Sequence, residues 1–318
     1  MLARLAGELL PAARCPKQFS EALESFCDGA RSADLRVVLQ QLVRPCLNAK
    51  TPVQVYPLDG EDSLRSVGVH FHDNERLDIV DYFTGLGYIL SLQPYDFSQR
   101  MERVKLLALY AKLCKLSAAH VGSRAPTTVQ ILWPKNDPRI ALAASLSWFK
   151  PRQHFQLARS ARETVLRDLW GCNALVHPSP MQVRFPNPVG TLFGTCWGDC
   201  AEAISVSAFW KQVVAGTPLR TLALNVASIT TLDTETGLSA SDAILAEQTT
   251  LQDAFQILRR SQSLRPMCKN CEHLHRAIGA HVLDYADPHR VTDSVELYPP
   301  PAPTYCYSVP APPIHVLA

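Results

Sequence analysis

Apolar residues recur every three or four positions through much of the first half of the chain, which is the spacing of amphipathic helices. Residues 98–117 show it most clearly. Their apolar stripe consists of Val104, Leu107, Ala108, Ala111 and Cys114. Residues 35–44 and 77–92 have the same spacing. The first half of the chain is therefore predicted to be mainly helical.

A few short segments of this half have the pattern of strands instead. Residues 66–72 alternate apolar and polar side chains, and residues 53–58 are a second candidate. Residues 122–139 carry three prolines and a glycine, which is typical of a boundary between domains. Within them, the apolar run at 129–133 also fits a strand.

The second half alternates predicted helices and strands. In order, the pattern predicts a helix over 153–170, a hairpin over 173–185, a helix over 200–214, a strand over 221–228, a helix over 242–262 and a helix after Pro266. Ser239 or Ser241 is predicted to cap the helix over 242–262. Residues 281–286 and 295–299 are further strand candidates.

These patterns divide the chain into three parts and indicate an α/β fold class. Residues 1–149 are predicted to form a mainly helical region, which we expect to be an accessory module able to bind a protein partner. Residues 150–291 are predicted to form the α/β domain. Residues 292–318 form a Pro-rich tail with an extended or disordered composition.

The composition excludes several classes of protein. Hydrophobic residues make up 47% of the 318 positions, enough for a buried core, so a chain disordered throughout is excluded. Lys and Arg number 31 against 29 Asp and Glu, giving a net charge of +2. This near-balance argues against a basic nucleic-acid coat or an acidic tail protein. The basic stretch 150–167 is interpreted as a solvated helix face.

The N-terminal residues and the cysteines indicate a compartment. Glu8 interrupts the first apolar stretch, which excludes a signal peptide, although Arg4 and Arg14 leave a mitochondrial presequence open. No apolar run is long enough to span a membrane. We therefore expect an intracellular protein, cytoplasmic or nuclear. Its ten cysteines would be reduced and would serve packing or metal binding.

Two cysteine motifs carry the candidate chemistry. Cys200-Ala-Glu202 and Cys268-Lys-Asn-Cys271 each lie at a predicted helix start. Zinc binds thiolates tetrahedrally, and a catalytic site uses three protein ligands and leaves the fourth position open. Cys200, Cys268 and Cys271 are the predicted zinc ligands. Glu202 is the predicted general acid/base, because a carboxylate beside the ion can accept and return a proton.

This combination resembles the zinc deaminases, in which a His/Cys-x-Glu element precedes Pro-Cys-x-x-Cys and the Glu moves protons without binding the metal. The chain is similar to the cytidine-deaminase-like superfamily over residues 150–290. More narrowly, it is similar to a poorly characterised, largely fungal branch with a helical N-terminal region. The sequence departs from the motif at Met267, which separates Pro266 from Cys268.

The resemblance implies a three-layer α/β/α domain in which a hairpin, the Cys-x-Glu helix, a strand and the Cys-x-x-Cys helix follow one another. It also implies a hydrolytic deaminase that uses a zinc-bound hydroxide, with Glu202 as proton shuttle. The substrate would be a nucleobase, nucleoside, nucleotide or nucleic acid. The alternative is a non-catalytic interaction module with a structural zinc site, closed by Cys196, His273 or His275.

Other residues have weaker signals. His70 and His72 share one face of a predicted strand, but an exposed strand face explains them better than a metal site. Trp197, Phe209 and Trp210 lie near the proposed zinc helix, where core packing is favoured over base stacking. Asn225 lies in the predicted strand over 221–228, where it could contact a substrate, but it is interpreted as a turn former.

Overall fold

The computed structural model describes eleven stretches of the chain: 2–28, 33–49, 53–55, 64–71, 76–92, 99–147, 152–170, 185–186, 192–193, 199–234 and 236–285. No helix in these stretches is both long enough and apolar enough to cross a membrane. Several sequence predictions fall largely outside them: the hairpin over 173–185, the strand candidate at 295–299 and the Pro-rich tail 292–318. Two short strands, β5 (Phe185–Pro186) and β6 (Leu192–Phe193), pair antiparallel in this region.

The N-terminal part is mainly helical, as predicted. Its helices are α1 (Leu2–Ala12), α2 (Pro16–Asp28), α3 (Ala33–Val38), η1 (Leu39–Val43), α4 (Arg44–Asn48), α5 (Tyr82–Ser91), α6 (Arg100–Ser117) and η2 (Ala118–Val121). The predicted strand at 66–72 is confirmed as β1 (Val67–His70), which pairs antiparallel with β2 (Arg76–Ile79). The described residues of the candidate at 53–58, 53–55, are not a strand.

The prediction of one helix over 77–92 is wrong for its first residues. Leu77 and Ile79 are buried while Arg76 and Asp78 are exposed, so the segment alternates with the two-residue period of a strand. The helix α5 begins only at Tyr82. Asp81 caps it, because its carboxylate accepts a hydrogen bond from the Thr84 amide at 3.0 Å.

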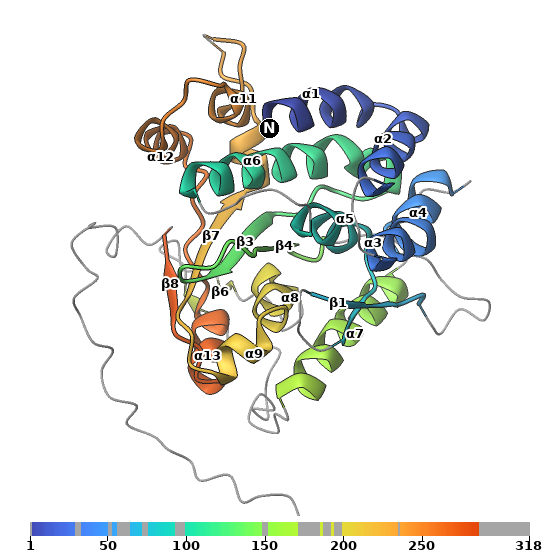
Figure 1. Cartoon of the computed structure of the whole chain (residues 1–318), viewed down its shortest axis with the longest axis vertical. Helices are drawn as coiled ribbons and strands as arrows, with labels where there is room; N and C mark the ends of the chain where they lie inside the picture. Colours follow the sequence, from blue (N-terminus) through green and yellow to red (C-terminus); the bar gives the residue numbers. More distant parts are fainter. Residues whose placement is uncertain are drawn as a thin grey trace, which may run out of the picture.

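Four strands form the central sheet, in the order β4-β3-β7-β8 (Figure 1). They are β3 (Thr128–Pro134), β4 (Ala141–Ala144), β7 (Leu219–Asn225) and β8 (Val282–Asp284). β3 runs antiparallel to both β4 and β7, and β7 runs parallel to β8. The strand candidates at 129–133, 221–228 and 281–286 are thus found, with α10 (Val226–Thr230) replacing the end of the second.

Helices cover both faces of this sheet, so the α/β class is confirmed. In Figure 1, α5 and α6 lie above the sheet, while α8 (Ala201–Ser207) and α13 (Lys269–Ala277) lie below it. Ser91 on α5 accepts a hydrogen bond from the Leu142 amide of β4 at 2.8 Å. From the other face, Ser205 on α8 donates to Gln130 of β3 at 2.8 Å.

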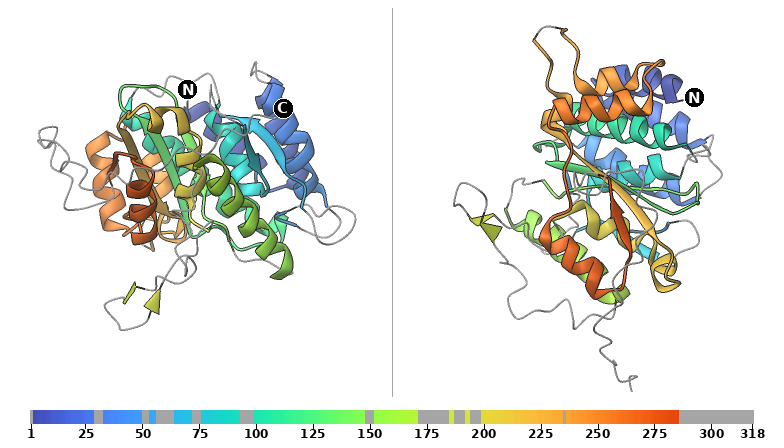
Figure 2. Two further views of the ribbon diagram at one scale, coloured as in Figure 1. Left: turned by 90° about the horizontal axis from the view of Figure 1, so that it is seen from below. Right: turned by 90° about the vertical axis from the view of Figure 1, so that its left-hand side faces the viewer.

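Two predicted helices are each split in the structure. The helix predicted over 200–214 is α8 followed by α9 (Trp210–Val214), and the one over 242–262 is α11 (Ala240–Leu245) followed by α12 (Leu251–Arg260). Ser239 caps α11 as predicted, and Thr250 caps α12 with a second capping box. Both helices lie beside α6 (Figure 2). Lys112 of α6 pairs with Asp242 of α11.

The predicted boundary between residues 149 and 150 does not divide the molecule. β3 and β4 precede it, yet β3 pairs with β7 over seven residues. One hydrophobic core cluster contains Leu2, Leu107, Leu222 and Leu274, so the N-terminal helices and the sheet share their interior. The Pro-rich segment 122–139, whose composition is typical of a boundary, contains β3 and is therefore part of the central sheet. The helix predicted over 153–170 is α7 (Arg152–Trp170).

Candidate metal centre

Cys200 lies where the chain enters α8, on the face of the sheet opposite α6. It is the N-cap residue of α8, with an extended backbone (φ −74°, ψ 145°). The preceding residue, Asp199, is held twice. Its carbonyl accepts from the Leu146 amide at 2.8 Å, and its carboxylate accepts from Nε and Nη2 of Arg159 at 2.8 and 2.6 Å. These contacts fix the turn that presents the Cys200 thiol.

Cys268 and Cys271 occupy the matching position on α13. Cys268 is the N-cap residue, again with an extended backbone, and Cys271 lies in the first turn of the helix. A spacing of three residues places the two side chains on one side of the helix start. Both helices therefore direct thiols toward one point from their N-terminal ends.

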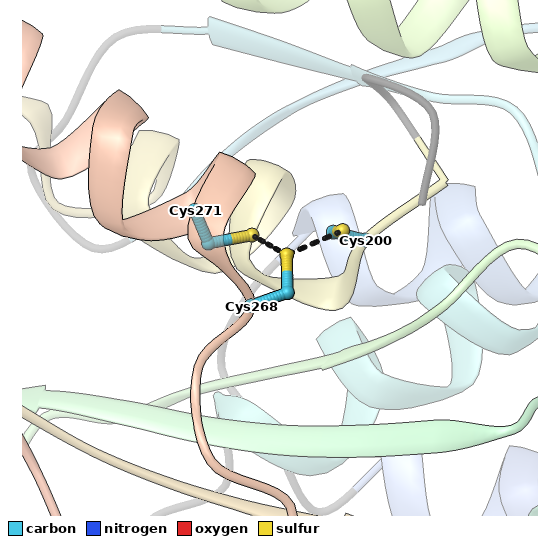
Figure 3. Close-up of side chains that lie close together, drawn as sticks. All are labelled: Cys200, Cys268 and Cys271. Atoms are coloured by element: carbon cyan, nitrogen blue, oxygen red, sulfur yellow. Dashed lines mark hydrogen bonds between the residues drawn. The ribbon is translucent and has the colours of Figure 1, made fainter. Parts of the chain in front are cut away.

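The three sulfur atoms form a compact cluster (Figure 3). Cys268 Sγ lies 3.7 Å from Cys200 Sγ and 3.4 Å from Cys271 Sγ, and all three atoms lie within 4.8 Å of one another. With zinc–sulfur bonds of about 2.3 Å, a tetrahedral site separates its sulfurs by about 3.8 Å. The buried cluster therefore has the size and the donor type to bind a metal ion, and soft thiolate ligands suit zinc.

Without a cation, the thiols oppose one another's ionisation. Contact with the Cys268 sulfur, together with burial, raises the pKa of Cys200 well above its ordinary value. Contacts with the other two sulfurs, together with burial, do the same for the pKa of Cys271. Like charges at this distance in a buried site disfavour each other, and a divalent cation would reverse that balance.

Glu202 lies in the first turn of α8 and is only 7% exposed. Burial raises its pKa from 4.5 to about 7, and negative charge on Cys268 adds to the shift. A carboxyl group with a pKa near neutrality can both accept and release a proton at neutral pH. Without a bound cation, Glu202 can therefore exchange a proton near neutral pH, and a divalent cation beside it would lower this pKa.

His275 is a further buried group close to the cluster. It lies one helical turn after Cys271, is 4% exposed, and has no hydrogen-bond partner for either ring nitrogen. The cluster of mutually close ligand atoms in the described residues contains the three thiols but not His275. Cys196 and the side chain of His273 lie outside the described residues. Among the groups that the structure describes, none therefore occupies a fourth ligand position.

The remaining candidates have structural roles where they are described. Asn225 caps α10 by accepting from the Ser228 amide, as expected of a turn former. Phe209 is fully buried, and His70 pairs with Asp34. His72 and Trp197 lie outside the described residues.

Sequence patterns did not reveal the contacts that support the centre, which involve Arg159, Asp199 and Asp284. Asp284 accepts from the Met267 amide at 2.7 Å, directly before Cys268. Arg159 and Asp199 lie 40 positions apart in the sequence, and Asp284 and Met267 lie 17 apart. No local motif therefore connects the partners.

No protein-family model matches the chain, and neither does any curated protein or solved structure. What the molecule does must therefore be inferred from the chemistry of this centre.

Proposed function

We propose that this protein is a zinc-dependent hydrolytic deaminase that acts on a nucleobase, nucleoside, nucleotide or nucleic acid. One observation carries the proposal: three thiols from the starts of α8 and α13 converge at zinc-binding distances. The start of α8, which carries Cys200, also carries the buried Glu202, whose pKa is about 7. Three thiolates with no described fourth ligand correspond to the open type of zinc site.

The order of elements around the centre supports the resemblance to the cytidine-deaminase-like superfamily. A hairpin (β3-β4), the helix with Cys200 and Glu202 (α8), a strand (β7), the helix with Cys268 and Cys271 (α13) and a strand (β8) follow one another. The hairpin lies at 128–144, earlier than the segment at 173–185 that sequence patterns favoured. The three-layer arrangement agrees with the same proposal.

In the proposed reaction, Cys200, Cys268 and Cys271 hold the ion. When bound, zinc lowers the pKa of a water molecule and so supplies a nucleophile near neutral pH. Glu202 accepts a proton from the attacking water and later delivers it to the departing amino nitrogen. A carbon–oxygen bond forms at the amidine carbon of the ring, the carbon–nitrogen bond breaks, and ammonia leaves.

The alternative is a structural zinc site in a non-catalytic interaction module. His275 favours it, because its two ring nitrogens are buried without a partner one helical turn from Cys271. A rotated His275 side chain would complete a closed site with three cysteines and one histidine. Glu202 would then be an ordinary carboxylate of the first helical turn. The N-terminal helices remain the proposed surface for a protein partner.

Metal analysis and ammonia release together test the proposal. We expect about one zinc ion per chain. Cys268→Ser and Cys271→Ser should lose the ion, whereas Cys15→Ser, at a half-buried thiol outside the cluster, should keep it. Glu202→Gln should retain zinc and the folded state but lose ammonia release by at least about 100-fold on a panel of amino-substituted bases and nucleosides.

Each outcome distinguishes the two functions. Folded wild-type protein that contains no metal would contradict both. Zinc that is retained in the wild type but lost in His275→Ala, together with no ammonia release from any substrate, would favour the structural site. Ammonia release that persists in Glu202→Gln would remove Glu202 from its proposed role.

A further inference from the structure

The segment before α13, residues 263–267, runs along β7 like an added antiparallel strand. The Asn225 amide donates to the Ser263 carbonyl at 2.7 Å. Two residues further on, the Arg265 amide donates to the Ala223 carbonyl at 2.9 Å. The two bonds lie on either side of an antiparallel bridge between Leu224 and Leu264.

The next step of that ladder would pair Met267 with Thr221. The Thr221 carbonyl is already an acceptor, because β8 pairs with β7 at this point and the Tyr285 amide donates to it at 3.0 Å. The Met267 amide donates instead to the carboxylate of Asp284, at 2.7 Å. Asp284 is the register partner of Thr221 on β8, and it is 4% exposed. The Asp284 carboxylate therefore takes the place of the Thr221 carbonyl as the acceptor for the Met267 amide.

This hydrogen bond lies directly before the central thiol of the cluster. Cys268 follows Met267, and its sulfur lies between those of Cys200 and Cys271 (Figure 3). Cys271 is held relative to Cys268 by the first turn of α13. Cys200 belongs to a different helix. The separation between the two parts of the centre therefore depends on where the segment before α13 is anchored.

We infer that Asp284 is a positioning residue for the metal centre: by accepting from the Met267 amide, it holds the Cys268 thiol at ion-binding distance from Cys200. Hydrogen bonds that orient metal ligands from outside the ligand set commonly change metal affinity by about 10- to 100-fold when they are removed. The inference rests on the ion-binding part of the proposed function and does not require catalysis.

Two variants of Asp284 separate its acceptor from its bulk. Asp284→Asn keeps an acceptor oxygen, whereas Asp284→Leu keeps the branch at Cγ but is larger and has no acceptor. Zinc affinity is measured in the full chain by competition with a chromophoric chelator. Asp284→Leu should bind zinc about 10- to 100-fold more weakly, while Asp284→Asn stays close to the wild type. Asp253→Ala, which removes an exposed carboxylate from the capping box of α12, should leave the affinity unchanged.

A spectroscopic readout follows the position of the thiols themselves. With cobalt(II) in place of zinc, the thiolate-to-metal charge-transfer absorption should weaken or shift in Asp284→Leu and persist in Asp284→Asn. In addition, the Met267 amide of the wild type should exchange its hydrogen slowly, because its acceptor is buried.

Several results would overturn the inference. A folded Asp284→Leu variant that binds zinc as tightly as the wild type would overturn it. So would an Asp284→Asn variant whose zinc affinity falls as much as that of Asp284→Leu. Both results would leave the proposed function standing. If Asp284→Leu does not fold, a Met267 amide that exchanges at the rate of an unstructured peptide overturns it. A wild type that binds neither zinc nor cobalt removes the inference and the proposed function together.

Discussion

At the scale of single residues, burial moves two ionisable groups, Glu202 and His275, toward their neutral forms. It raises the pKa of Glu202 to about 7 and lowers the pKa of His275 from 6.5 to about 4. The cause is the same in both cases, since a buried site disfavours charge of either sign. For Glu202 the shift suits proton transfer, whereas for His275 it makes the histidine a neutral imidazole at neutral pH.

His275 is expected to make the protein sensitive to acid. Its pKa in the folded protein, about 4, lies below the ordinary value of 6.5. Above about pH 6.5 the imidazole is neutral in both states. As the pH falls from 6.5 toward 4, the unfolded chain binds a proton that the folded protein does not, so the folded protein loses stability. Between pH 7 and pH 5, this should lower the free energy of unfolding by about 2 kcal/mol. Urea denaturation at both pH values should show that loss, and His275→Leu should show less of it.

His281→Leu is the matched control, because His281 is exposed. The free energy of unfolding of the His281→Leu variant should depend on pH as that of the wild type does. Loss of a bound ion at low pH affects all three proteins, so the difference between His275→Leu and the other two isolates the imidazole. Equal pH dependence in all three would contradict the argument.

At the scale of elements, α5 and β4 are in close contact through a glycine. A Cβ atom at Gly87 would lie 2.7 Å from the Leu142 carbonyl oxygen and 2.8 Å from the Tyr110 hydroxyl. Neither neighbour is free to move, since Leu142 is in the sheet and Tyr110 donates to the Phe83 carbonyl at 2.7 Å. The packing of α5 on β4 therefore requires a residue without a side chain at this position.

Gly87→Ala is expected to lower the free energy of unfolding by about 1–3 kcal/mol, as overpacking in a core typically does. Gly7, in α1, is the matched control, because no atom lies within 4 Å of its added Cβ. Gly7→Ala should raise stability by about 0.5–1 kcal/mol, owing to the better helix propensity of alanine. Equal effects of the two substitutions in urea denaturation would contradict the contact at Gly87.

Some helices and helix caps could be predicted from local sequence patterns alone. Helices such as α6 and caps such as Ser239 followed from residues within one turn of each other, so the sequence predicted them. The split between α8 and α9, and that between α11 and α12, interrupt segments that were predicted as single helices. In the second case Thr250 starts a new helix, a cap signal that the apolar spacing alone concealed.

At the scale of the whole molecule, the sheet joins segments from both halves of the chain. A chain that begins at residue 150 lacks β3, β4 and α6. In it β7 would keep β8 but lose the longer pairing with β3, and the core would lose the residues that α6 contributes. Such a chain should show no cooperative thermal unfolding, whereas the full chain should show one transition followed by circular dichroism. Cooperative unfolding of the shorter chain would restore the predicted boundary at 149/150.

The sequence by itself determined most helices, the strands β1, β3, β7 and β8, and the candidate set Cys200, Glu202, Cys268 and Cys271, because each is a pattern of near neighbours. Only the tertiary structure brought the three thiols within 4.8 Å and buried Glu202. It also decided that β3 and β4 belong to the same sheet as β7, and that Asp284 accepts a hydrogen bond from the Met267 amide directly before Cys268. Strand pairing and burial depend on residues far apart in the chain, and their partners leave no local spacing to recognise.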